Sequence, residues 1–287
     1  MQYAVAEALK GGVPGLVAMA IQVLALMWLR TTMNYQYRYG TSTREALRTL
    51  YAQGGIRRFY QGLLPALIQG PLSRFGDTAA NAGVMAFFAA AASADSGMLL
   101  VAARLPLALK SLVASLTAAL FRIVLTPVDT LKTAMQVEGD RALPMLASKI
   151  AKGGPGVLFH GALATSAATF AGHYPWFLVY NTLDSTIPKP SKDALALKLL
   201  RSAVLGFFGS LAADLASNAL RVVKTAKQTS ETPISYSDAT KAILEREGLQ
   251  GLFVRGLGTK ILCNGIQGTL FSVLWRLGQE RLAAGQK

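Results

Sequence analysis

The ten residues from Pro127 to Gln136, PVDTLKTAMQ, decide the interpretation of this sequence. They combine a proline with an acid and a base, Asp129 and Lys132, whose three-residue spacing places both on one helix face. They end an apolar stretch at about 105–131, and a membrane-spanning helix needs only about 20 mostly apolar residues. The stretch therefore predicts a membrane helix that carries charged side chains near its end.

Five further apolar stretches accompany this one. The clearest, from Gly11 to Leu29, contains no charged residue, and the others occupy about 62–94, 153–183, 195–223 and 261–275. A large soluble helical core, the alternative, would show polar helix faces at a 3.6-residue period, and the first and fourth stretches lack them. Six spans would put both ends of the chain on the same side of a membrane.

The charge composition also favours a membrane protein. Of the 287 residues, 52% are hydrophobic and 15% are charged, against about 25% charged in soluble domains. The net charge of +14 comes from basic residues between apolar stretches, not in polar, aromatic-interleaved segments, so no nucleic acid is expected as a partner. Three long loops hold 15 Lys and Arg residues, against nine in the termini and short links. Because loops on the inner side of a membrane are rich in Lys and Arg, this bias predicts that the long loops lie on the inner side.

The sequence predicts neither an enzyme nor a metal or cofactor site. One cysteine, Cys263, excludes a disulfide framework, and two histidines are too few for a zinc centre without many carboxylates. Walker, HExxH and GxSxG motifs do not occur in the chain.

A repeat of about 100 residues runs through the chain. The polar loops end in GGIRRFYQG, GGPGVLFHG and EGLQGLFVRG, whose last glycines, Gly62, Gly161 and Gly256, are 99 and 95 residues apart. The repeat predicts an all-α membrane protein with six transmembrane helices, which close into a pseudo-threefold bundle with short helices on the inner side. The predicted repeats are 1–100, 101–191 and 192–287.

The signature and the repeat together resemble the mitochondrial carrier family over the whole chain. PVDTLKTAMQ fits the family's pattern through Pro127, Asp129, Lys132 and Gln136, and EGLQGLFVRG fits its second motif. The resemblance implies a multi-pass protein of the mitochondrial inner membrane that transports a solute and has both termini in the intermembrane space. It also implies that a proline bends each odd helix, and that the acid of one repeat pairs with the base of the next to close a cavity on the matrix side.

The other two repeats depart from this pattern. The matching residues are Ala25, Met27, Arg30 and Asn34 in repeat 1, and Ala219, Arg221, Lys224 and Gln228 in repeat 3. Asp129 is thus the one acid of the ring, and we expect a single inter-repeat ion pair, with Lys224 as the partner that the resemblance implies. The surplus positive charge must be hydrated or neutralised by lipid or a partner, because an unpaired charge at a low-dielectric constriction is costly.

The second charged ring of the family, at the opposite end, is not retained. Repeat 2 has Asp184 where the family has a base, and repeat 3 has Arg276 and Gln279 after Trp275. We therefore expect no ring of ion pairs at that end.

The resemblance places the solute contacts seven or eight residues after each turn glycine. The corresponding residues are Gln69, Ala168, Thr169, Cys263 and Asn264. All are neutral, which predicts a solute other than a polyanion, because fixed cations are needed to compensate a buried anion.

Arg122 and Asp214 are a further pair of candidate site residues. Each lies five residues before the proline position of its repeat, Pro127 and Ala219, so the two occupy equivalent places on spans three and five. A charge inside a membrane is a functional hypothesis by default. We expect a pair or a shared network, with direct solute contact as the alternative.

The turns at Gly62, Gly161 and Gly256 open helices whose free N–H groups attract anions. In the family such turns bind cardiolipin, and only the third retains a base, Arg255. We therefore expect membrane lipids as partners, with cardiolipin or another acidic phospholipid at Arg255.

Two functions remain open on the sequence alone. The first is a carrier that moves a small solute across the inner membrane, which the retained signature in repeat 2 favours. The second is a carrier-fold protein that has lost transport and serves as an accessory subunit, with other subunits of an inner-membrane complex as partners. The incomplete charged rings favour this second function.

Overall fold

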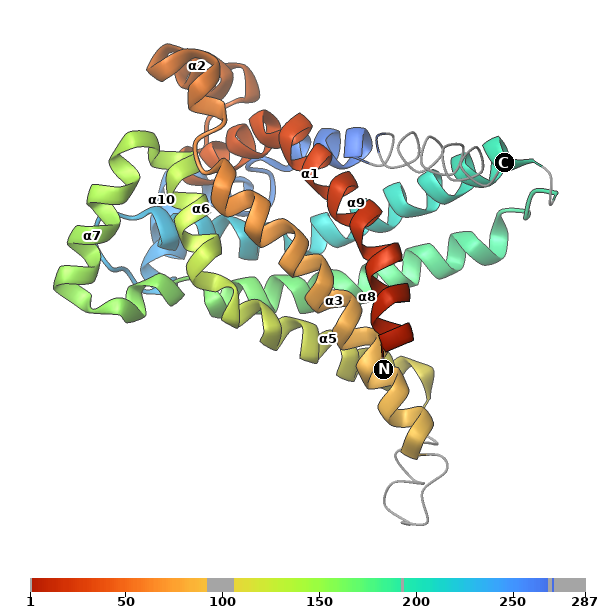
Figure 1. Cartoon of the computed structure of the whole chain (residues 1–287). Helices are drawn as coiled ribbons and strands as arrows, with labels where there is room; N and C mark the ends of the chain where they lie inside the picture. Colours follow the sequence, from red (N-terminus) through yellow and green to blue (C-terminus); the bar gives the residue numbers. More distant parts are fainter. Residues whose placement is uncertain (1, 92–105, 192–193, 268–269, 271–287) are drawn as a thin grey trace.

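The computed structural model describes residues 2–91, 106–191, 194–267 and 270. Helices joined by short loops make up this part of the chain, and no strand occurs in it (Figure 1). The helices are α1 (Gln2–Tyr39), α2 (Thr43–Phe59), α3 (Leu63–Ala91), α5 (Leu107–Val124), α6 (Thr126–Glu138), α7 (Ala142–Gly153), α8 (Ala162–Thr186), α9 (Leu195–Thr229), α10 (Tyr236–Phe253) and residues 257–267. Short 3₁₀ turns occur at Gly139–Arg141 and Pro155–Phe159.

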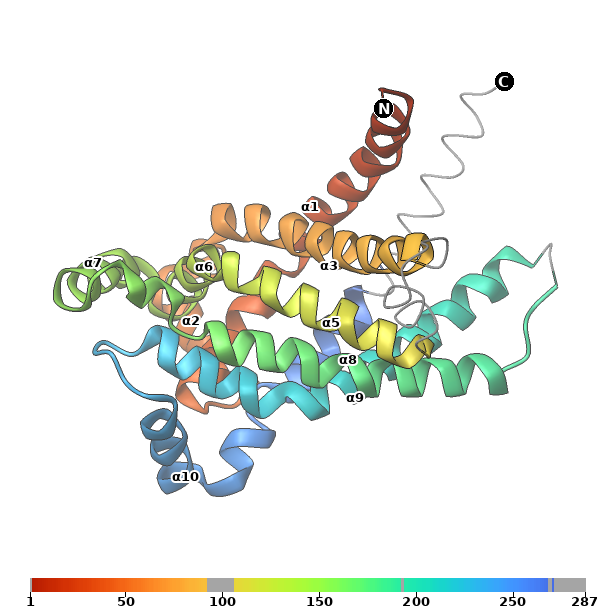
Figure 2. The ribbon, with the colours of Figure 1, turned by 90° about the horizontal axis from the view of Figure 1, so that it is seen from below.

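The contacts between the long helices form a closed circuit. Helix α1 contacts α3, α3 contacts α5, α5 contacts α8, α8 contacts α9, and α9 returns to α1. The shorter helices α2, α7 and α10 are arranged around one end of these long helices (Figures 1 and 2). This arrangement leaves the centre of the circuit to side chains that point inward.

The proline of the signature lies at a break in the chain. Helix α5 ends at Val124, α6 begins at Thr126, and Pro127 is in the first turn of α6. Proline fits the first turn because its missing N–H would have no helical partner there. The chain bends by 64° between Leu112–Val124 and Thr126–Gly153, as the resemblance implied for this proline.

Among the described residues, one helix, Leu195–Thr229, is long and apolar enough to cross a membrane. The bent pair Leu112–Val124 and Thr126–Gly153 qualifies as a second span if it is counted as one helix. The predicted sixth span, 261–275, is described only to residue 267 and at 270, and the predicted repeat boundaries near 100 and 192 lie outside the described residues. Six spans in a pseudo-threefold arrangement therefore remain a prediction.

Candidate functional site

A cavity of about 400 Å³ lies between the long helices. It is lined by side chains of α1, α3, α5, α6, α8 and α9 and of the helical residues 257–267. Its charged lining consists of one acid, Asp129, and six bases, Arg30, Arg122, Lys132, Arg221, Lys224 and Lys260. The cavity is therefore strongly positive, although the sequence positions first expected to line it are neutral.

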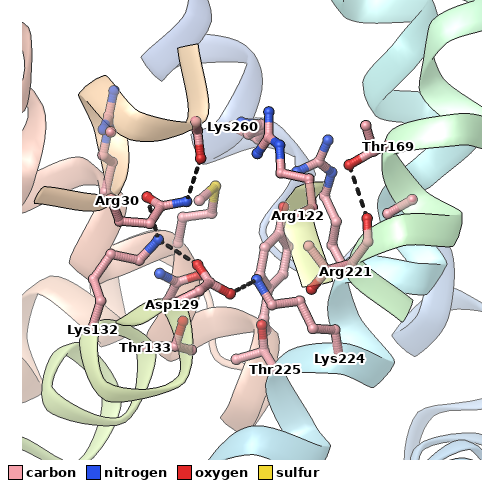
Figure 3. A pocket seen from close by; sticks show the side chains of 18 of the residues that line it. Arg30, Arg122, Asp129, Lys132, Thr133, Thr169, Arg221, Lys224, Thr225 and Lys260 are labelled. Carbon is pink, nitrogen blue, oxygen red and sulfur yellow. Dashed lines mark hydrogen bonds and ion pairs between the residues drawn. The ribbon is translucent and has the colours of Figure 1, made fainter. Parts of the chain in front are cut away.

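Asp129 joins α6 to α9. Its Oδ2 is 2.5 Å from Nζ of Lys224, and its Oδ1 is 2.7 Å from Nζ of Lys132 (Figure 3). The side-chain amide of Gln228 donates a further hydrogen bond to Oδ2 at 3.3 Å. The expected contact between Asp129 and Lys224 is present, and it ties the helices of the second and third predicted repeats together.

Neutral hydrogen bonds occupy the other two contacts between odd helices. Nδ2 of Asn34 on α1 donates to Oε1 of Gln136 on α6 at 2.6 Å. The hydroxyl of Tyr37 donates to Oδ1 of Asn218 on α9 at 3.2 Å. These contacts link the same pairs of helices as the ion pairs that the resemblance implied, but through other residues, because Met27 and Arg221 occupy the acid positions of repeats 1 and 3.

Two of the bases not held by Asp129 donate hydrogen bonds to neutral groups. Nη2 of Arg30 donates to Oε1 of Gln267 at 3.3 Å, and Nε of Arg221 donates to Oγ of Ser217 at 3.1 Å. Lys260 lines the same cavity (Figure 3). Sequence reasoning missed Lys260, although it lies four residues before Asn264 and so shares a helix face with a residue that was considered.

The predicted contact positions are mostly at the cavity. Gln69, Ala168, Thr169 and Cys263 line it. Oε1 of Gln69 accepts a hydrogen bond from Nζ of Lys132 at 3.2 Å, so this neutral position is linked to the Asp129 cluster. Asn264 instead donates to the carboxylate of the buried Asp214.

The expected ion pair between Arg122 and Asp214 does not form among the described residues. Arg122 lines the cavity, whereas the amide of Asn264 occupies the carboxylate of Asp214. An amide from the following helix satisfies this acid locally, so Asp214 ties α9 to residues 257–267 and not to α5.

The three turn glycines mark close contacts between helices. Their φ angles are +83° at Gly62, +91° at Gly161 and +63° at Gly256, a region that favours glycine. A Cβ atom at these positions would lie 3.0 Å from the carbonyl oxygen of Lys132, 3.0 Å from Cγ of Gln228 and 2.7 Å from Cε1 of Tyr37, respectively. Each glycine thus lets the odd helix of the next predicted repeat approach closely, and lipid binding at these turns stays a prediction.

Each of these contacts also has a basic side chain that binds the end of the neighbouring helix. Nη1 of Arg58 donates to the carbonyl of Gln136 at 2.8 Å, Nζ of Lys149 donates to that of Gln228 at 3.3 Å, and Nη1 of Arg255 donates to that of Tyr37 at 3.2 Å. The last carbonyls of a helix have no partner within it and carry partial negative charge, so a buried cation stabilises them. We call the three arrangements of turn glycine and basic side chain the helix-end joints.

Arg255, the base expected to bind an acidic phospholipid, contacts protein groups. Its Nε and Nη2 lie 2.7 and 2.6 Å from the two carboxylate oxygens of Glu247, and its remaining nitrogen binds the end of α1. The side chain is 5% exposed. Most of its donors are therefore occupied by protein groups, and an acidic phospholipid at this turn stays a prediction.

At the opposite end of the long helices, Asp184 is paired. Its Oδ1 is 2.7 Å from Nη1 of Arg201, which links α8 to α9. Trp275, Arg276 and Gln279, the repeat 3 positions considered for this end, lie outside the described residues.

A model of the family described as mitochondrial carrier protein matches residues 104–191 and 196–283. No curated protein matches the sequence at a significant level. The two matched segments together cover more than half of the chain and contain the signature, Asp129, Lys224 and the third turn glycine. The chain belongs to the mitochondrial carrier family.

Proposed function

We propose that this protein is a carrier-type transport protein, and that it moves a small solute across the mitochondrial inner membrane through the central cavity. Proteins of the family are multi-pass transporters of that membrane. The observation that carries the proposal is a cavity of about 400 Å³, within the size range of small-molecule sites, next to the Asp129–Lys224 ion pair. The closed circuit of long helices and the three helix-end joints support the three-repeat, six-span bundle as its framework.

Transport by alternating access requires that the contacts closing one end can break while those at the other end form. The pair between Asp129 and Lys224 is the charged contact between the second and third repeats at the cavity's inner end. The hydrogen bond between Asn34 and Gln136 does the same for the first and second repeats with less energy, since a neutral hydrogen bond is weaker than a charged one. This end would therefore open without breaking three ion pairs.

Exchange measurements in liposomes test the proposal. Purified protein is reconstituted with nucleotides, dicarboxylates, amino acids or phosphate inside, and uptake of the same solutes is followed. We expect saturable exchange of one class, and a loss of at least about tenfold in Asp129→Asn, because the substitution leaves Lys132 and Lys224 without their acid. Glu231→Gln, which removes an exposed acid after α9, is the matched control and should exchange normally. Absence of exchange with every solute would overturn the proposal.

The accessory-subunit function is the second candidate. The observation that favours it is that, among the described residues, a single ion pair, between Asp129 and Lys224, joins different repeats at this ring. Native separation of membranes in mild detergent distinguishes it. An accessory subunit migrates with a large complex and shows no exchange, whereas a carrier migrates alone with its detergent.

A further inference from the structure

The bases that line the cavity exceed its acids by a wide margin. Asp129 contacts Lys132 and Lys224, and the other bases of the lining besides Arg122 are Arg30, Arg221 and Lys260. Within the described residues none of these three side chains forms an ion pair, and the hydrogen bonds of Arg30 and Arg221 go to an amide and a hydroxyl. Three positive charges therefore face one space without a carboxylate partner.

These charges converge on the cavity from different helices. Arg30 comes from α1, Arg221 from α9 and Lys260 from residues 257–267, and Figure 3 shows them around the space beside Asp129. Like charges held together in a protein interior destabilise the empty site, because each loses hydration and repels the others. The repulsion is relieved when a negatively charged molecule occupies the cavity.

The chemistry of the lining selects the kind of anion. A guanidinium presents paired donors that match a carboxylate or phosphate, and an ammonium adds a point charge. Neutral polar groups at Gln69 and Thr169 complete the lining and can bind the uncharged part of a solute. A volume of about 400 Å³ restricts the occupant to a small molecule.

We propose that the cavity binds a small oxyanion with at least two negative charges, a dicarboxylate or a phosphate compound, through Arg30, Arg221 and Lys260. The inference rests on the proposed function and names its solute class. The sequence predicted a solute other than a polyanion, because Gln69, Thr169 and Asn264 are neutral. The structure supplies the positive charge from other positions, so that prediction loses its basis.

Binding to the purified protein in a neutral detergent tests the inference independently of transport. The probes are malonate and inorganic phosphate, compared at matched ionic strength with acetate and alanine. We expect malonate or phosphate to bind saturably and to raise the melting temperature, and acetate and alanine to have little effect. Failure of both malonate and phosphate to bind overturns the inference, and so does their displacement by added cardiolipin, which would assign the charge to lipid.

Substitutions locate the site. Arg221→Gln and Lys260→Gln should each weaken binding of the divalent probe by about tenfold or more, because each removes a charged hydrogen bond. Both variants should melt at a higher temperature than the parent protein without ligand, since each removes an uncompensated charge. The matched control is Arg141→Gln, an exposed base on the surface, which should change neither property. Unchanged probe affinity in Arg221→Gln and Lys260→Gln would overturn the inference.

The proposed function can fail separately. Binding of malonate or phosphate without exchange in liposomes would sustain the oxyanion site and overturn transport. Exchange of a neutral solute with no binding of either anion would sustain transport and overturn the oxyanion site.

Discussion

Lys149 is an unusual residue because it is a lysine with 1% of its surface exposed. Its Nζ donates to the carbonyl of Gln228, and no ion pair reaches it from the described residues. Burial, reinforced by the nearby charges of Arg38 and Lys227, lowers the pKa of Lys149 to about 8. A lysine in the unfolded chain keeps a pKa near 10.4. The folded protein therefore loses this proton before the unfolded chain does.

The sign of the resulting pH dependence follows from proton linkage. Between about pH 8 and pH 10.4 the unfolded state binds more protons at Lys149, so the free energy of unfolding rises with pH. We expect an increase of about 1–3 kcal/mol across this window, measured by thermal or denaturant unfolding in detergent. Lys149→Met should remove most of the slope, and Lys152→Met, which changes an exposed lysine on the same helix, should keep it. An equal slope in the parent protein and Lys149→Met would contradict the assignment.

At the residue scale the sequence predicted one part of the site and missed another. The contact of Asp129 with Lys224 could be predicted. The signature gives the helix face on which each residue lies, and the resemblance implies that the acid of one repeat pairs with the base of the next. Lys260 and Lys149 could not be located in the same way. Whether a base points into a cavity or caps a neighbouring helix depends on packing between segments far apart in the chain.

At the scale of elements, the helix-end joints hold the long helices to one another. In each joint a turn glycine lies against an odd helix, and a base from the same predicted repeat binds the last carbonyls of that helix. The internal repeat of the sequence located the three glycines, and lipid binding was the role expected of their turns. The repeat could not show that the facing surface is a helix of the next repeat, because spacing along the chain does not give distances across it.

A substitution at the middle joint tests this role. Gly161→Ala would place a Cβ 3.0 Å from Cγ of Gln228 and 3.1 Å from Cγ of Lys224, at a φ of +91° that alanine rarely adopts. We expect a loss of about 1–3 kcal/mol in the free energy of unfolding, seen as a lower melting temperature. Gly156→Ala, with no atom within 4 Å of the added Cβ, is the control and should melt close to the parent protein. Equal melting temperatures for the two variants would show that Gly161 does not form a tight contact.

At the scale of the whole molecule, the sequence predicted the helical class and the family, and its six spans stay a prediction. The family model matches the second and third predicted repeats, which retain the signature acid or the second motif. It does not extend over residues 1–103, where repeat 1 has Ala25 and Met27 in place of the proline and the acid. Apolar packing keeps α1 in the circuit: Leu26 and Leu29 pack against Cys263, and Val23 packs against Ala66 together with Met27, the residue at the acid position.

The distribution of charge predicts the orientation of the molecule. The three long loops, which hold 15 basic residues, should lie on the matrix side, and both termini should face the intermembrane space. We expect an epitope tag at either terminus to be digested by protease once the outer membrane is opened. A tag inserted after Lys152 should be protected until the inner membrane is lysed. Protected termini with an accessible tag at residue 152 would reverse the orientation.

The joint at Arg255 has a consequence for how the molecule assembles. It connects Arg255 to the carbonyl of Tyr37, a separation of 218 residues, and Gly256 lies against the same tyrosine. The end of α1 therefore has no cap until more than 250 residues have been synthesised and imported, whereas the other two joints link segments 78 and 79 residues apart. Because closing a longer loop costs more entropy, the contact between the first and last repeats should be the last to form. Until then the newly made protein is an open chain of helices with an exposed helix end, and a protein shortened before Gly256 would stay in that state.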